Sequence, residues 1–254
     1  MPKTNKGDVA AQRKRYKLRY PEKVKAEKAR YRKAHPEKIK EEKRQYALLH
    51  PDRIQKYTKQ YNTKLRSEII EYYSNGFFRC AICEDNHIEF LEIVKTGPSD
   101  NYDCSNFSQF NKMQWLKNNN FPDGYIILCS NCNTKRIKVA ARVIGTDGTY
   151  EQKKCYRKLM RMKQDVFSHY SEDGKIKCSC PGCNVDDIDM LCVDHKNNDG
   201  NEHRKTLGVK QIKYGWIKKN NYPDYLRVLC HNCNQSLGKY GYCPHEKTNL
   251  PMVI

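Results

Sequence analysis

The chain has 254 residues, of which 38% are hydrophobic, and its formal net charge is +19. So low an apolar fraction argues against one large hydrophobic core and favours several small units held together by other means. The excess positive charge favours a polyanionic partner, with DNA the first expectation and RNA the less favoured one. The sequence shows no signal peptide and no apolar run long enough to span a bilayer. Nothing in it resembles an amphipathic anchor with a bulky apolar face, which argues against a membrane partner.

Residues 1–66 form a basic arm with 22 Lys and Arg against 7 acidic residues. The arm repeats every fifteen residues, and the positions in register are Tyr16, Tyr31, Tyr46 and Tyr61, with Pro21, Pro36 and Pro51 between them. Proline suits the first turn of a helix, and the acid that follows it favours the positive helix end. We therefore expect short helices that kink at the prolines. They would serve as an electrostatic clamp on phosphates, and the alternative is a solvated, partly disordered tail.

Two similar units follow the arm, at 67–139 and 178–246. The segment 140–177 is interpreted as a linker and a helix, and 247–254 as a tail. Each unit has a C-x-x-C pair, a short apolar strand, a polar loop, a helix, a second strand and a second C-x-x-C pair. Gly76 and Gly174 are the expected stops of helices that precede the units, and Asp147-Gly148 is a turn. The tryptophans of the two middle helices, Trp115 and Trp216, are expected to pack in the core.

Thirteen cysteines, mostly in C-x-x-C pairs, are more typical of metal sites than of disulfides in a chain without a signal peptide. We therefore expect an intracellular protein, in the cytoplasm or nucleoid, or in a host cell if it is viral. Two pairs per unit predict two tetrahedral structural zinc sites, one formed by Cys80, Cys83, Cys129 and Cys132, the other by Cys180, Cys183, Cys230 and Cys233.

The run CSCPGC leaves one ambiguity in the second zinc site. Counting back from the strand selects Cys180, which preserves the two-residue gap, whereas counting forward from Gly174 selects Cys178. We prefer Cys180. Cys243 and His245 could form an extra metal site, although a structural contact of the C-terminal segment is favoured. His231, inside the last knuckle, is expected to be exposed.

The second unit carries residues for chemistry that the first unit lacks. Asp194-His195 ends an apolar strand and Asn234 directly follows the last knuckle, whereas the aligned first unit reads Val94-Lys95. A carboxylate and an amide oxygen can hold a hard divalent cation, and a neutral imidazole can take a proton from water. The pattern favours metal-assisted phosphodiester hydrolysis. The structural alternative is a hydrogen-bonded Asp-His pair with Asn234 capping a helix.

These motifs resemble the HNH nucleases, also called ββα-metal or His-Me finger nucleases, of the phage type with embedded four-cysteine zinc knuckles. The ending CNQSLG and the upstream HPEK repeats are also similar to phage recombination nucleases of the endonuclease VII type. The resemblance implies Asp194 and Asn234 as ligands of Mg²⁺ or Mn²⁺ and His195 as general base. It implies a middle asparagine that steadies the base, for which Asn221 and Asn198 are the candidates.

His203 and Arg204 lie in the loop after the Asp-His pair, where a cation could grip the scissile phosphate or the leaving oxygen. At the matched positions of the first unit, Val94 cannot bind a metal and Lys95 cannot serve as an imidazole-like base. The basic residues of this unit instead favour a noncatalytic module that binds DNA, or a solvated basic face. These basic residues are Lys95, Lys112, Lys117, Lys135 and Arg136.

The expected fold is a small α+β protein with duplicated zinc-stabilised ββα-metal units behind a basic helical arm. The expected function is a Mg²⁺-dependent DNA endonuclease that nicks as a monomer, or cuts both strands as a dimer, in a homing or phage-like role. The rivals are a noncatalytic zinc protein that binds DNA or RNA and a structure-specific nuclease that acts on junctions.

Overall fold

The computed structural model describes residues 6–96, 109–171, 174–209 and 212–247. They form a small mixed α/β protein that is mostly helical and contains two small antiparallel sheets. The chain divides into two compact units, one that ends at Thr63 and one that begins at Lys64. None of the helices in the described ranges combines the length and the apolar character needed to cross a membrane.

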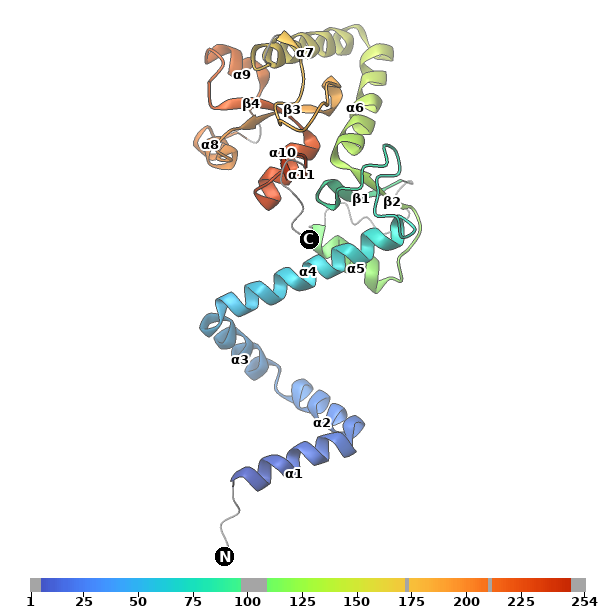
Figure 1. Cartoon of the computed structure of the whole chain (residues 1–254), viewed down its shortest axis with the longest axis vertical. Coiled ribbons are helices and arrows are strands. Elements are labelled where there is room, and N and C mark those ends of the chain that lie inside the picture. Colours follow the sequence, from blue (N-terminus) through green and yellow to red (C-terminus); the bar gives the residue numbers. More distant parts are fainter. Residues whose placement is uncertain (1–5, 97–108, 172–173, 210–211, 248–254) are drawn as a thin grey trace, which may run out of the picture. The chain divides into compact units, whose positions relative to one another are not determined.

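The first compact unit is the repeated arm, built from helices α1 (Lys6–Arg19), α2 (Pro21–Ala34), α3 (Pro36–Leu49) and the start of α4 (Pro51–Tyr73) (Figure 1). The helices break at the prolines, as the repeat predicts. Each break carries a tyrosine ring against the aromatic ring four residues later, with centroids 4.7 Å apart for Tyr31–His35 and 4.5 Å for Tyr46–His50. Neither α2 nor α3 buries a residue, so local propensity and these ring contacts hold the arm together.

The second compact unit contains the two cysteine units in sequence. The first cysteine unit follows the last turns of α4 and consists of η1 (Ile88–Phe90), β1 (Leu91–Lys95), α5 (Gln109–Asn118), β2 (Tyr125–Cys129) and α6 (Ser130–Asp147). Helix α4 ends at Tyr73, and the turn after it closes at Gly76, whose φ of 81° suits a glycine and whose N–H donates to Glu71 O at 2.8 Å. Strands β1 and β2 pair antiparallel, with Leu91 opposite Cys129.

The second cysteine unit has the same order of elements plus short additions. It consists of α7 (Tyr150–His169), η4 (Ile188–Met190), β3 (Leu191–His195), α8 (Gly200–Thr206), α9 (Tyr214–Lys219), β4 (Leu226–Cys230), α10 (His231–Tyr240) and α11 (Pro244–Lys247). Leu191 lies opposite Cys230, the same register as in the first hairpin.

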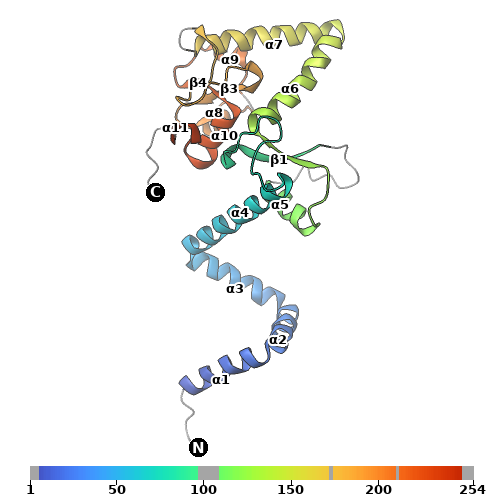
Figure 2. The ribbon, with the colours of Figure 1, turned by 45° about the vertical axis from the view of Figure 1, so that its right-hand side comes forward.

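The structure departs from the expected element boundaries in two places. Helix α6 continues to Asp147, so most of the expected linker from 140 is helical. A new helix, α7, starts at once because Thr149 and Gln152 form a capping box. The loop expected after His195 contains α8. Figure 2 shows α6 and α7 meeting at a corner.

The two cysteine units repeat the same contacts around their hairpins. Tyr73 donates its hydroxyl hydrogen bond to Pro122 O at 2.8 Å, and Tyr170 donates to Pro223 O at 2.9 Å. The Arg66 guanidinium donates to Ile88 O at 2.6 Å, and Lys163 Nζ donates to Ile188 O at 2.5 Å. The tryptophans of α5 and α9 are half-buried against the core, which confirms their packing role.

A reciprocal contact joins the two cysteine units. Asn131 N donates to Asn232 Oδ1 at 2.9 Å, and Asn232 N donates to Asn131 Oδ1 at 2.9 Å. Both asparagines are buried, with 4% and 2% of their surface exposed. The N-terminal turns of α6 and α10 therefore lie against each other, which fixes how the two knuckles sit within this compact unit.

Candidate functional site

The first cysteine group consists of Cys80, Cys83, Cys129 and Cys132, whose sulfurs all lie within 4.8 Å of one another. Four thiolates at about 2.3 Å from a tetrahedral zinc ion would stand about 3.8 Å apart. Cys83 Sγ and Cys129 Sγ are 3.6 Å apart. The group therefore fits a zinc ion, as the sequence predicts.

In the second cysteine group the structure corrects one expected ligand. Cys178, not Cys180, joins Cys183, Cys230 and Cys233 within 4.8 Å. The backbone explains this, because Cys178 N donates to Val185 O at 2.8 Å just as Cys80 N donates to Asp85 O at 2.8 Å. The run CSCPGC is thus a knuckle with two extra residues, and Cys180 lies in the extra part.

The thiols at these two equivalent positions share an electrostatic environment. Hydrogen bonding with Cys129 lowers the pKa of Cys80 to about 4. The pKa of Cys178 is lowered as well, mainly by hydrogen bonds with Cys183, Cys230 and Cys233. A thiolate is the form that binds zinc, so both groups contain a cysteine poised for the metal.

His231 departs from the expected exposure. It is half-buried and its Nε2 lies 3.2 Å from Lys138 Nζ on α6. Burial, with Lys138 nearby, lowers its pKa to about 4, so the ring is neutral at pH 7 and can accept a hydrogen bond from the ammonium group. His231 therefore serves the contact between the cysteine units.

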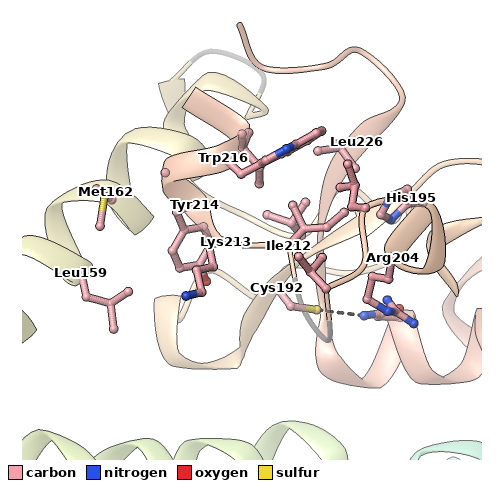
Figure 3. Close-up of a pocket in the computed structure, with 16 residues that line it drawn as sticks. Leu159, Met162, Cys192, His195, Arg204, Ile212, Lys213, Tyr214, Trp216 and Leu226 are labelled. Atoms are coloured by element: carbon pink, nitrogen blue, oxygen red, sulfur yellow. Dashed lines mark hydrogen bonds between the residues drawn. The ribbon is translucent and has the colours of Figure 1, made fainter. Parts of the chain in front are cut away.

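Asp194 and His195 end β3, and His195 borders a cavity of about 1090 Å³. Its lining includes Cys192, His195, Arg204 and Asn234, and the opposite side is formed by Leu159 and Met162 of α7 (Figure 3). The structure thus brings three of the predicted residues, His195, Arg204 and Asn234, to one hollow.

His195 is held from several sides. It is only 8% exposed, and its Nε2 lies 2.9 Å from Nδ1 of His203 on α8. Gly200 packs so closely that a Cβ there would come within 2.7 Å of His195 Nδ1. Burial lowers the pKa of His195 below its ordinary value, so the imidazole is neutral at pH 7.

Asp194 and Asn234 both have protein partners. Asp194 Oδ2 accepts a hydrogen bond from Arg227 Nε at 2.9 Å, and the Asp194 side chain is 14% exposed. Asn234 Nδ2 donates to Cys192 Sγ at 3.1 Å. Cys192 and Asp194 point to the same face of β3 because side chains alternate along a strand. The Asn234 amide therefore lies over the face of the strand that carries Asp194.

The candidates for the middle asparagine separate clearly. Asn198 N donates to His195 O at 3.0 Å, directly after the strand. Asn221 is exposed at the end of α9 with a φ of 54°, and Asn120 occupies the same turn after α5 with a φ of 55°. The structure places Asn198 beside the predicted base and gives Asn221 a turn position.

The corresponding place in the first cysteine unit is built differently. Glu92 stands where the second unit has Cys192, and it accepts a hydrogen bond from Asn133 Nδ2 at 3.2 Å. Glu92 also accepts from Gln235 of the second unit. Several expected DNA-gripping cations have internal partners, since Lys112 Nζ contacts Ile93 O, Lys117 contacts Glu68 and Lys135 contacts Asp187.

Sequence reasoning missed Arg227 and Gly200. The hairpin register offers a signal for Arg227, because β4 read antiparallel to β3 puts it opposite Asp194. No sequence signal marked Gly200. Comparison with models of protein families, with curated proteins and with solved structures gave no match to this chain.

Proposed function

We propose that the chain is a DNA endonuclease of the HNH class, in which two ββα-metal units arose by duplication and only the second one cuts. The observation that carries this proposal is the grouping of His195, Arg204 and Asn234 around one cavity, with Asp194 next to His195 in β3. The first cysteine unit repeats the surrounding contacts and has Val94 and Lys95 at the matched positions. The contrast favours a catalytic role over a purely structural one.

In this proposal His195 is the general base. It accepts a proton at Nε2 from the water that attacks the phosphorus, and the water takes the place that His203 Nδ1 holds beside this atom. Burial keeps the ring neutral and therefore able to accept the proton. Gly200 packs against the other ring nitrogen, Nδ1, and holds the ring in place, so it acts as a positioning residue.

Asp194 and Asn234 offer a carboxylate and an amide oxygen, the hard donors that Mg²⁺ or Mn²⁺ prefers. The fit rests on their placement on one face of β3, one from the strand and one from α10. A bound Mg²⁺ would supply positive charge at the scissile phosphate. Arg204, which lines the cavity together with His195 and Asn234, would neutralise the charge of a phosphate oxygen.

The arm would supply most of the affinity for DNA. With 22 basic and 7 acidic residues it holds +15 of the net charge of +19. Lys and Arg side chains of the arm would contact phosphates and not bases, so they would not select a DNA sequence. Binding should weaken steeply as the salt concentration rises, because the contacts are electrostatic.

The test is nicking of supercoiled plasmid with Mg²⁺ by wild type, His195→Ala and the matched control Lys95→Ala. Loss of the base should lower the cleavage rate by about 10²- to 10⁴-fold, whereas the control should cut like wild type. DNA binding, measured alongside by gel shift, should stay within a few-fold in all three. Equal cleavage by wild type and His195→Ala would rule the assignment out.

A second candidate is a noncatalytic zinc protein that binds DNA or RNA. The contact between Asp194 and Arg227 favours it, because a carboxylate paired with an arginine is a common structural arrangement. Tight binding of nucleic acid with no cleavage in Mg²⁺ or Mn²⁺ would support this candidate. Cleavage that increases when Arg227 is replaced by Gln would instead show that the arginine competes with a metal ion.

A further inference from the structure

The second cysteine unit contains more ligands than one zinc ion can use. Cys180, Cys243 and His245 lie together with Cys233, and their ligand atoms are all within 4.8 Å of one another. Cys233 also belongs to the group with Cys178, Cys183 and Cys230. We propose that the second cysteine unit holds two zinc ions that share the Cys233 thiolate.

The distances around Cys233 match this arrangement. Its sulfur lies 3.4 Å from Cys230 Sγ on one side and 3.3 Å from His245 Nδ1 on the other. Cys243 Sγ lies 3.7 Å from the same His245 nitrogen. For zinc with sulfur at about 2.3 Å and nitrogen at about 2.0 Å, ligand atoms stand about 3.5 to 3.8 Å apart. A thiolate sulfur has lone pairs enough to bind two metal ions, so one residue can serve both tetrahedra.

The chain is built to bring these ligands together. Helix α10 ends at Tyr240, and the next residue, Gly241, has a φ of 75° that allows the chain to turn back. Ser236 Oγ donates to Tyr242 O at 2.8 Å and fixes the returning segment. Gly182 then packs against it so tightly that a Cβ would come within 2.1 Å of His245 O. The two extra residues in CSCPGC and the CPH segment are therefore pressed into contact.

The burial of these cysteines and the net charge of the site also favour binding of a second zinc ion. Cys180, Cys233 and Cys243 are at most 4% exposed, so their thiolates would be costly without a cation. Six cysteines and one neutral histidine around two Zn²⁺ leave a net charge of −2, the same as a single Zn²⁺ with four thiolates. Sharing Cys233 therefore adds a second ion without adding net charge.

Within the described ranges, His245 belongs to one other possible metal group, with Asp85 and His87 of the first cysteine unit. In that group His87 Nδ1 is already bonded to Asp85 Oδ1 at 2.9 Å, whereas His245 directs Nδ1 at the two sulfurs. His245 also packs on Phe90, with ring centroids 5.0 Å apart. The second ion would thus tie the C-terminal segment to the second knuckle and place His245 against the first unit.

The first cysteine unit provides an internal comparison. Its knuckle, CAIC, is two residues shorter and has no counterpart of Cys180. Helix α6 continues to Asp147, while α10 stops at Tyr240 and turns. The first unit is therefore expected to hold one zinc ion and the second to hold two.

The test is the zinc content of the full chain, measured by native mass spectrometry and by elemental analysis. Wild type should bind three zinc ions, and Cys243→Ser and Cys180→Ser should each bind two. Cys155→Ser, which changes an exposed cysteine on α7, should keep all three. Two zinc ions in wild type, or no loss in either variant, would overturn the proposal.

The shared thiolate has its own readout in protein loaded with ¹¹³Cd. Two of the three cadmium signals should show a mutual scalar coupling through Cys233, and the third should be single. Three uncoupled signals would overturn the sharing of Cys233. This measurement needs no variant to fold and no nuclease activity, so it is independent of the proposed function.

Discussion

The two cysteine units have the same packing but different residues at the end of their first strand. Both have a hairpin in the same register, a tyrosine bonded to a proline carbonyl and a four-cysteine group. At the end of the first strand one unit has Val94-Lys95 and the other Asp194-His195. The scaffold therefore depends on the cysteines and the core, because it forms with either pair of residues at the strand end.

We expect the largest effect on stability when a zinc ligand is removed at one of two equivalent positions, by Cys129→Ser or Cys230→Ser. Structural zinc in small modules contributes on the order of 10 kcal/mol to folding, so each change should unfold its unit or lower its melting temperature sharply. Circular dichroism and zinc release would measure this. The exposed Cys155→Ser should behave like wild type, and equal stability of all four proteins would show that the groups do not hold zinc.

Removing either half of the reciprocal asparagine contact should have a smaller and symmetric effect. Asn131→Ala leaves the buried N–H of Asn232 unpaired, and Asn232→Ala does the same to Asn131. Each should lower the free energy of unfolding by about 1–3 kcal/mol in denaturant titrations. Exposed Asn197→Ala is the control. A large difference between the two variants would contradict the symmetry.

Gly200→Ala tests how His195 is positioned. The added Cβ would lie 2.7 Å from His195 Nδ1 and push the ring aside, so DNA cleavage should fall by about tenfold or more. Gly215→Ala in the same cavity is the matched control, since its Cβ would meet Met162 Sδ at 3.9 Å. The proposed role of the His195 ring would be contradicted if both variants cut equally fast.

The smallest expected effect is a shift in pH dependence. Burial lowers the pKa of His195, so the neutral base persists to lower pH than for an ordinary histidine with a pKa of about 6.5. Cleavage should therefore be at its plateau at pH 7 and fall only as pH drops through a value below 6.5. A rate profile over pH 5 to 8 measures this, and an acid limb above pH 7 would contradict it.

Much of the fold follows from sequence patterns that act locally. The proline repeat determines where helices of the arm begin, because α2, α3 and α4 each start at a proline that is followed by an acidic residue. The apolar runs that end at Lys95 and His195 form strands as expected. The first cysteine group follows from its spacing, because the knuckle CAIC has no spare cysteine.

The rest depends on contacts that spacing does not encode. Cys178 replaces Cys180 because backbone bonds to Val185 and Val228 set the knuckle, and residue counting does not include them. Helix α8 forms in a polar run that has no helical apolar pattern. Its first residue, Gly200, packs on His195, and this contact exists only in the folded protein. His231 is half-buried because Lys138, far away in sequence, lies against it.

The Asn131–Asn232 contact has the form of an isologous interface, in which residue i meets j and j meets i. Such an interface normally joins two separate subunits and dissociates when the protein is diluted. Here both faces belong to one chain, so association is intramolecular and its effective concentration is fixed by the helices between them. A pairing of two halves with different residues at the strand end can then persist at any protein concentration, which a symmetric dimer of identical subunits could not achieve.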